Sequence, residues 1–268
     1  MDKRLKLQKE LDLFKNREKD LRKVKRYSLY KTMFYRTDLW THTRRVSWIV
    51  GELIPLAQKF FGNSFEPEKA LALAFVHDDA EIVFGDIQAG NKAKMNKEEL
   101  KRVEEMELSA LEDLSKRYPV NLSNYIYHDL LLEAVNRESV ESIIVNWADK
   151  YDAYCEALHE LYAGNKLWSV NVVNEYGRID IPTEYYIKYF NSFESKFPKS
   201  KDLFLQKNKW FTIPEEPNIF EILDRSYMHT RDSLNIKKNY LYYDQWIDLT
   251  LNNGTEEDIE NLFNIKEK

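Results

Sequence analysis

Residues 65–86, FEPEKALALAFVHDDAEIVFGD, decide how this chain folds. Pro67 stands near the first position of a helix with acidic residues beside it, which favours a helix start. The run from Ala70 to Val83 is almost wholly apolar and Gly85 closes it, so we expect one buried helix. Its polar exceptions are His77, Asp78, Asp79 and Glu81. Because buried polar groups need partners, this stretch also indicates a functional site.

The rest of the chain has the spacing of helices. Apolar residues recur at helical intervals in 46–56, 97–117, 123–136, 139–163 and 183–196. In 97–117 the predicted inner face is Leu100, Val103, Met106, Leu111 and Leu114. Only 7 Gly and 7 Pro occur in 268 residues, and no stretch predicts a strand ladder. We therefore predict an all-α fold: a basic helical arm at 1–20, a helical body at 21–200 and an α-helical C-terminal extension at 201–268.

Composition excludes several protein classes. A single cysteine rules out an internal disulfide and a cysteine zinc cluster. No apolar run approaches the length of a membrane span, and the charged N-terminus has no signal-peptide segment. We expect a soluble, cytoplasmic protein with no membrane partner.

Charge is spread unevenly along the chain. Residues 1–31 hold 12 Lys/Arg against 5 Asp/Glu, whereas the whole chain has a net charge of −5. A basic arm can bind phosphates or nucleic acid. Acidic residues interrupt this one, however, so we favour a solvated amphipathic helix and do not expect a nucleic-acid partner.

Four residues have the chemistry of a metal site. His42 opens one helix, His77 and Asp78 interrupt the apolar stretch, and Asp149 interrupts the apolar helix at 139–163. Two imidazoles and two carboxylates can hold one divalent ion such as Mn²⁺, Co²⁺, Fe²⁺ or Zn²⁺. Glu81, four residues after His77 on the same face of the expected helix, could orient or deprotonate a water there. Asp86 follows Gly85 and would face the same cavity.

These residues resemble those of a known family. The pattern His42, His77-Asp78, Asp149 is similar to the signature of HD-domain metal-dependent phosphohydrolases. HDDAEIVFGDI (77–87) and WADKYDAYCEALHELYAGN (147–165) resemble two blocks of the bacterial 5′-deoxynucleotidases. The resemblance covers about residues 20–200. It implies an HD-domain helical bundle that is commonly dimeric and removes the 5′-phosphate from deoxynucleoside monophosphates.

The resemblance also assigns roles to residues. It implies that the quartet of His42, His77, Asp78 and Asp149 binds the metal and that Glu81 and Asp86 are catalytic. An Arg-Trp pair of the family, which contacts phosphate and selects the sugar, has its nearest match in Arg26-Tyr27, with Arg36 as a rival arginine. A lysine after the Gly-Asp element matches Lys92, with Lys94 as a second choice.

Other histidines and other functions stay open. His128-Asp129 repeats the dipeptide, and we assign it a structural or pocket role; His159 is predicted to face solvent near a helix end. The same metal site could instead hydrolyse a nucleoside triphosphate or a cyclic or signalling nucleotide. A non-catalytic nucleotide-sensing module is the third hypothesis.

Overall fold

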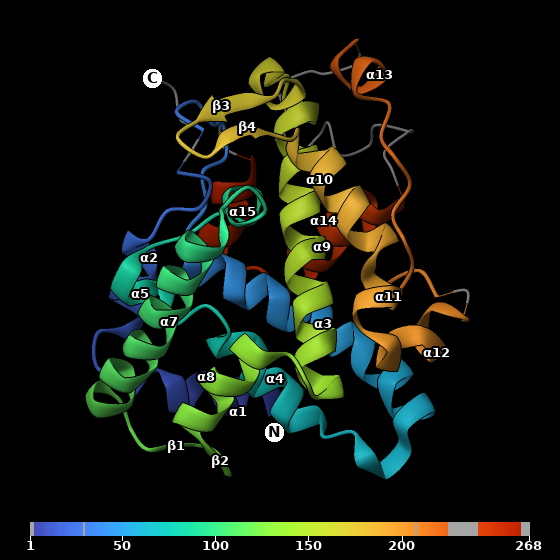
Figure 1. The fold of residues 1–268 in the computed structure, drawn as a ribbon. Helices are drawn as coiled ribbons and strands as arrows, with labels where there is room; N and C mark the ends of the chain where they lie inside the picture. Colours follow the sequence, from blue (N-terminus) through green and yellow to red (C-terminus); the bar gives the residue numbers. More distant parts are fainter. Residues whose placement is uncertain (1–2, 29, 207, 225–240, 264–268) are drawn as a thin grey trace.

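The structure is a computed structural model that describes residues 3–28, 30–206, 208–224 and 241–263 (Figure 1). Its long helices are α3 (Leu39–Phe61), α7 (Lys97–Arg117) and α9 (Val140–Tyr162). The medium helices are α1 (Lys3–Leu11), α4 (Pro67–Val76), α8 (Tyr127–Asn136), α10 (Pro182–Asn191), α14 (Leu241–Asn253) and α15 (Glu256–Phe263). Among the described residues the only strands form two short hairpins, β1–β2 (Asn121–Leu122, Tyr125–Ile126) and β3–β4 (Val172–Asn174, Gly177–Ile179). The predicted all-α class is confirmed.

The remaining elements are short. They are α2 (Arg17–Lys23), α5 (Glu81–Phe84), α6 (Ala89–Lys92), α11 (Phe193–Lys196), α12 (Lys201–Phe204), α13 (Ile219–Asp224) and the 3₁₀ turns Gly62–Ser64, Lys166–Ser169 and Pro198–Ser200. No helix in the described ranges combines enough length and hydropathy to cross a membrane.

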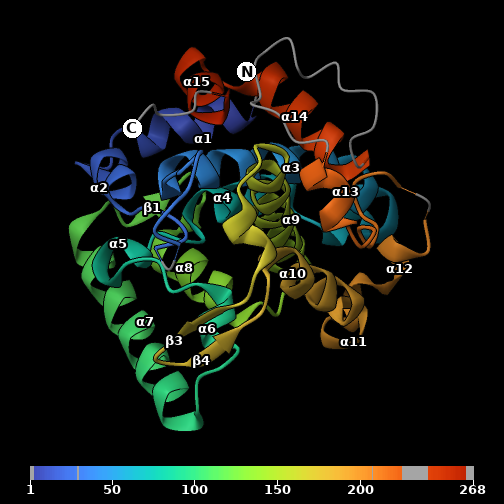
Figure 2. The same cartoon turned by 90° about the horizontal axis from the view of Figure 1, so that it is seen from above.

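Helix α9 runs through the middle of the molecule, as Figures 1 and 2 show from two directions. It packs against α3, α4 and α10, and nearly all of its side chains are buried. The Ser139 hydroxyl caps it by accepting from the Ser142 amide, which satisfies one free helix N–H. Helix α14, from the C-terminal extension, lies on both α3 and α9. Polar residues on α3, α4 and α9 are therefore brought together at the centre of the fold.

The expected single helix over the opening stretch is wrong, because α4 ends at Val76 and α5 begins only at Glu81. The Asp79 amide donates to the Val76 carbonyl at 3.0 Å, a tighter turn than an α-helix makes. The Phe75 carbonyl, its α-helical acceptor, is taken instead by Arg17 Nη2 at 2.6 Å. Arg17 also grips the Asp79 carboxylate at 2.6 and 2.7 Å. A tertiary contact thus overrides the local helical pattern.

The buried face of α7 is narrower than the sequence pattern predicts. Helix α7 has its predicted bounds, and Val103, Leu111 and Leu114 are buried. Leu100 and Met106, predicted to face inward, are 42% and 44% exposed, because the helix lies at the side of the molecule and buries a narrower stripe.

Candidate metal centre and its pocket

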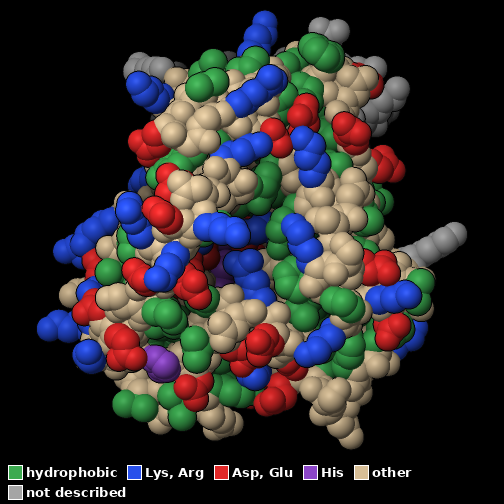
Figure 3. Space-filling view, viewed as in Figure 1, with side chains coloured by type: hydrophobic (Ala, Val, Ile, Leu, Met, Phe, Trp, Pro, Cys, Tyr) green, Lys and Arg blue, Asp and Glu red, His purple; other side chains and the backbone are tan. Residues whose placement is uncertain are grey.

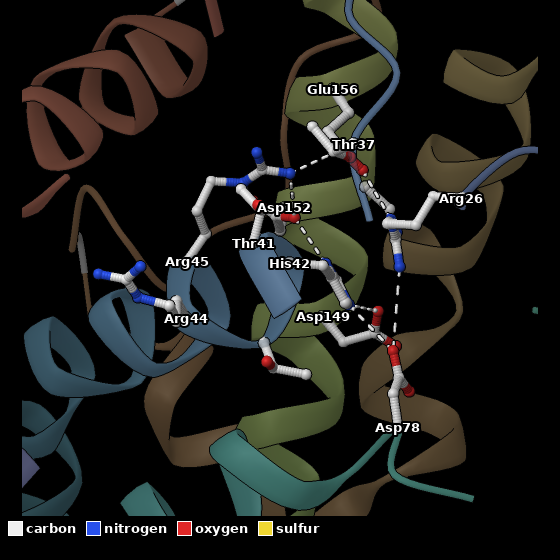
Figure 4. Close-up of polar contacts among 12 residues, drawn as sticks. Arg26, Thr37, Thr41, His42, Arg44, Arg45, Asp78, Asp149, Asp152 and Glu156 are labelled. Carbon is white, nitrogen blue, oxygen red and sulfur yellow. Dashed lines mark hydrogen bonds and ion pairs between the residues drawn. The ribbon is translucent and has the colours of Figure 1, made fainter. Parts of the chain in front are cut away.

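Four side chains, from α3, from α9 and from the turn after α4, meet at the centre of the fold. His42 lies in the first turns of α3, Asp149 projects from α9, and Asp78 follows α4 (Figure 4). His77, directly before Asp78, is the first residue after α4. His42 Nε2 lies 3.3 Å from an oxygen of Asp78 and 3.3 Å from an oxygen of Asp149. His77 Nε2 lies 3.4 Å from the other oxygen of Asp78. Residues separated by more than 100 positions therefore face one point.

The two imidazoles present their Nε2 atoms as acceptors. The Nδ1 atom of His42 lies 2.7 Å from a carboxylate oxygen of Asp152, and Nδ1 of His77 lies 2.9 Å from the Ala74 carbonyl. Both partners only accept, so each Nδ1 carries a hydrogen, and in the neutral ring each Nε2 then carries a lone pair that can bind a cation. Within the described residues neither buried Nε2 makes a hydrogen bond. An orphaned buried acceptor is costly unless a cation fills the place it faces.

The separations fit one ion. Two nitrogen or oxygen ligands at about 2.1 Å from one metal lie about 3.0–3.4 Å apart in octahedral or tetrahedral geometry. The three distances above fall in that range. Ligand atoms of His42, His77 and Asp78 all lie within 4.8 Å of one another, and Asp149 joins this group through its contact with His42. The two carboxylate oxygens of Asp149 have different partners. One faces His42 Nε2, and the other accepts a hydrogen bond from Lys150 Nζ at 2.5 Å. The donor set is thus suited to a divalent cation.

The charges also favour a cation at this point. Burial and the charge of Arg26 lower the pKa of His42, but the neighbouring carboxylates of Asp149, Asp152 and Asp78 outweigh them and raise it to about 10. Burial alone would raise the pKa of Asp78, yet His77 and His42 hold it below its usual value. Three carboxylates around one imidazole therefore stabilise positive charge, whether from a proton or from a bound ion.

A layer of buried charges holds His42 in place. Asp152, fully buried on α9, accepts from His42 and also from Arg45 Nε at 2.7 Å. Glu156, one turn further, accepts from Arg45, from Thr37 and, at 2.9 Å, from Arg26 Nε. Such outer partners fix the tautomer and orientation of a metal-binding histidine.

Two more carboxylates stand beside the quartet. Glu81 and Asp86 both line the cavity that Asp78 and Asp149 also line. Burial first, and then the charges of Asp78 and Asp86, raise the pKa of Glu81 well above its usual value. Burial likewise raises the pKa of Asp86, with Arg26 opposing the shift. Asp86 accepts from the Tyr27 amide at 3.0 Å, and one oxygen of Glu81 is buried without a partner in the described structure.

The family model described as "5′-deoxynucleotidase YfbR-like" matches residues 14–195, more than half of the chain. The chain belongs to this family. It is 32% identical over 124 residues to a 5′-deoxynucleotidase of Vibrio cholerae, covering 46% of this chain and 62% of that relative. A 5′-deoxynucleotidase of Pasteurella multocida is 26% identical over 151 residues, covering 54% of this chain and 73% of that protein. Residues 196–268 lie outside the family match.

A solved structure adds only a weak likeness. A conserved hypothetical protein from Pyrococcus furiosus covers 64% of this chain with a TM-score of 0.45 and 24% identity. The family assignment therefore depends on the sequence matches alone.

In this YfbR-like chain Asp78 and Asp149, the two carboxylates of the quartet, line a cavity of about 380 Å³. Pockets of ~300–1,000 Å³ bind small ligands. Figure 3 shows a hollow in this face with Lys and Arg side chains gathered around it. Its basic lining residues are Arg26, Lys92, Arg137, Lys150 and Lys196, and its aromatic lining residues are Tyr27, Tyr30, Tyr185, Tyr186 and Tyr189. The cavity thus combines cations for phosphate with rings for an apolar ligand face.

The predicted substrate residues lie in this cavity. Arg26 is buried and its Nη1 lies 3.9 Å from Asp78. Tyr27 is held in a left-handed conformation, with its hydroxyl donating to the Ala153 carbonyl at 2.8 Å and its ring 4.8 Å from that of Trp168. Lys92 lines the cavity while paired with Glu107 at 2.5 Å. Tyr27 is therefore a fixed wall, and Arg26 a cation beside the quartet.

The alternative substrate residues, Arg36 and Lys94, do not line the cavity. Arg36 donates to the backbone carbonyls of Arg26, Tyr27 and Tyr30, so it shapes the loop behind the cavity. Lys94 does not line the cavity but lies 3.8 Å from Asp180. Arg26 and Lys92 are thus better placed for a ligand than either rival.

His128 and His159 both lie away from the cavity. His128 and Asp129 lie on α8 with their side chains 35% and 68% exposed, and neither lines the cavity. His159 is buried, not solvent-facing as predicted, because Tyr243 and the Leu262 carbonyl from the C-terminal extension cover it. The predicted helix end was correct, but the pattern of α9 alone does not show what packs on it.

Sequence reasoning missed Asp152, Glu156 and Arg45. Helical spacing held the signal: Asp152 follows Asp149 by three residues on α9, and Arg45 follows His42 by three residues on α3. Each therefore shares a face with a predicted ligand. Opposite charges on those faces could have indicated the network.

Proposed function

We propose that this chain is a metal-dependent phosphohydrolase that removes the 5′-phosphate from (deoxy)nucleoside monophosphates. One observation carries the proposal: two buried histidine Nε2 lone pairs face, at 3.3–3.4 Å, two carboxylates that line a basic, tyrosine-lined cavity. Family membership supports the same class of chemistry. We assign His42, His77, Asp78 and Asp149 as ligands of one divalent ion, with Mn²⁺, Co²⁺, Fe²⁺ and Zn²⁺ as candidates.

The ion, when bound, would polarise a phosphoryl oxygen and lower the pKa of a water. Glu81 orients the attacking water and takes one of its protons. Attack forms the new P–O bond as the bond to the nucleoside 5′-oxygen breaks, and Asp86 donates the proton that this oxygen needs. The raised pKa of Asp86 is suited to that donation. Solvent exchange then returns both carboxyl groups to their starting states.

Other residues bind the substrate. Arg26 and Lys92 neutralise the phosphate, and the Tyr27 ring lies against the nucleoside. Arg26 is fixed by Glu156, so its free guanidinium edge is pre-oriented beside Asp78. Lys92 would have to exchange Glu107 for the phosphate.

A second candidate substrate is a nucleoside triphosphate, or a cyclic or signalling nucleotide. It is favoured by three cations beyond Arg26 and Lys92 in the same cavity: Arg137, Lys150 and Lys196. A nucleotide-sensing module without catalysis is the remaining alternative, and it predicts binding without turnover.

The test is phosphate release from a panel of deoxy- and ribonucleotides with Mn²⁺, Co²⁺ or Mg²⁺. We expect release from 5′-monophosphates by the wild type and none by Asp78→Asn. Asp129→Asn is the matched control, since it makes the same change in an exposed His-Asp pair and should keep full activity. Hydrolysis of nucleoside triphosphates or of cyclic or signalling nucleotides, without release from 5′-monophosphates, would favour the second substrate class. No hydrolysis of any nucleotide would refute the proposed phosphohydrolase activity.

Assembly and location are proposed on the same basis. We propose a homodimer located in the cytoplasm. Light scattering on the purified protein should give twice the chain mass of 32.1 kDa, and a monomer mass would contradict it.

A further inference from the structure

The C-terminal extension packs, through α14, against the helices that carry the metal centre. Helices α14 and α15 belong to the part of the chain outside the family match. Helix α14 packs on α3 and α9, the helices that carry His42 and Asp149. In Figure 2 it lies on the same side of the molecule as α1 and α3. The extension therefore touches the scaffold of the site.

Hydrogen bonds join α14 to α9 at two places about two turns apart. The Tyr151 hydroxyl donates to the Tyr242 carbonyl at 2.8 Å, and His159 lies 2.6 Å from the Tyr243 hydroxyl. Between them, the Trp246 indole N–H donates to Asp152 Oδ1 at 2.7 Å. Trp246 is only 1% exposed, so water does not compete for this bond.

The Asp152 carboxylate is fully used. Its Oδ1 accepts from Arg45 Nε and Trp246 Nε1, both at 2.7 Å. Its Oδ2 accepts from His42 Nδ1 at 2.7 Å and from Arg45 Nη2 at 3.1 Å. A carboxylate offers about four lone-pair positions, and here four donors fill them. The orientation of Asp152, and through it that of the His42 ring, depends on all of these donors.

Trp246 also contacts Arg45, the other residue that donates to Asp152 Oδ1. The Arg45 guanidinium carbon lies 5.1 Å from the centre of the Trp246 ring, within cation–π range. Trp246 does not line the substrate cavity. Its polar contacts toward the site are those with Asp152 and Arg45.

We propose that Trp246 is a positioning residue for His42, so that α14 is a working part of the metal centre. Its indole N–H fixes Asp152, and Asp152 holds the His42 imidazole with Nε2 aimed at the ion. The inference rests on the metal site of the proposed function. It does not depend on which nucleotide is hydrolysed.

The experiment compares Trp246→Phe with Trp210→Phe in the full-length protein after chelator treatment. Phe keeps most of the ring and its face toward Arg45 but removes the N–H. Trp210 is a matched control: it is buried, its ring centre lies 5.9 Å from that of Tyr151 on α9, and its N–H has no partner in the described structure. The Kd for Mn²⁺ is measured from free Mn²⁺ by electron paramagnetic resonance, and the absorption spectrum of bound Co²⁺ is recorded.

We expect Trp246→Phe to raise the Kd for Mn²⁺ by about tenfold, the lower end of the effect of outer-shell partners. Its Co²⁺ spectrum should shift, whereas Trp210→Phe should match the wild type in both readouts. A purely structural role would lower the unfolding temperature of both metal-free variants alike and leave the Kd unchanged. If the wild type binds Mn²⁺ and Trp246→Phe binds it with the same Kd, the positioning role of Trp246 is overturned but the metal centre is not. A wild type that binds no ion overturns the metal centre as well.

Discussion

Arg17→Met should destabilise the protein more than any ordinary surface substitution. The Arg17 and Asp79 side chains are 1% and 0% exposed, and two hydrogen bonds join them at 2.6 and 2.7 Å. Removing the arginine leaves an uncompensated buried carboxylate, which costs about 3–5 kcal/mol. The Tyr127 hydroxyl, 2.7 Å from Asp79, remains its one other side-chain partner in the described structure. The loss of the Phe75 contact adds to that cost.

The double variant Arg17→Met/Asp79→Leu tests the reasoning. It removes both charges and leaves only the Tyr127 hydroxyl and the Phe75 carbonyl unsatisfied, so it should cost less than Arg17→Met alone. Arg22→Met is the surface control: Arg22 pairs with the exposed Glu257, and its loss should cost less than about 1 kcal/mol.

The free energy of unfolding is measured for each variant by urea titration followed by circular dichroism. If Arg17→Met cost no more than Arg22→Met, or if the double variant were the least stable, the buried Arg17–Asp79 ion pair would not have the stabilising role given to it here. Because this ion pair sets the turn that carries His77 and Asp78, the folded Arg17→Met protein should also bind Mn²⁺ more weakly.

Two further substitutions separate chemistry from metal binding. Glu81→Gln keeps the quartet but removes the proposed base, so kcat for phosphate release should fall by about 100- to 10,000-fold while Mn²⁺ binding persists; full activity would remove Glu81 from the mechanism. Asp152→Asn replaces an acceptor-only group by an amide, which cannot accept from all four donors around it. Its Kd for Mn²⁺, measured by calorimetry, should rise by about 10- to 100-fold, and wild-type affinity would contradict the role given to the His42–Asp152 bond.

The sequence predicted the helical class and the residues that meet at the site. His77, Asp78 and Asp149 can be identified as site residues because each is a polar residue within an apolar stretch, where an unpartnered polar group is costly to bury. Helical spacing also predicted the bounds of α7 and α9 to within a residue or two. The periodicity of apolar residues is enough to predict the bounds of a helix that is long and has a continuous apolar face.

The features that the sequence did not predict depend on contacts between residues far apart in the chain. The break between α4 and α5 is caused by Arg17, more than 50 positions away, which takes the carbonyl that a continuous helix would use. His159 is buried by residues of the extension, and Asp152 is completed by Trp246. A periodic pattern reports which face of a helix is buried, but not which charged residue will meet it.

The most direct test of the account is the position of Mn²⁺ in crystals, located by anomalous diffraction. We predict one strong peak within about 2.0–2.3 Å of His42 Nε2, His77 Nε2 and an oxygen each of Asp78 and Asp149. A peak elsewhere, or none at saturating Mn²⁺, would contradict the assignment of these four residues as the metal centre.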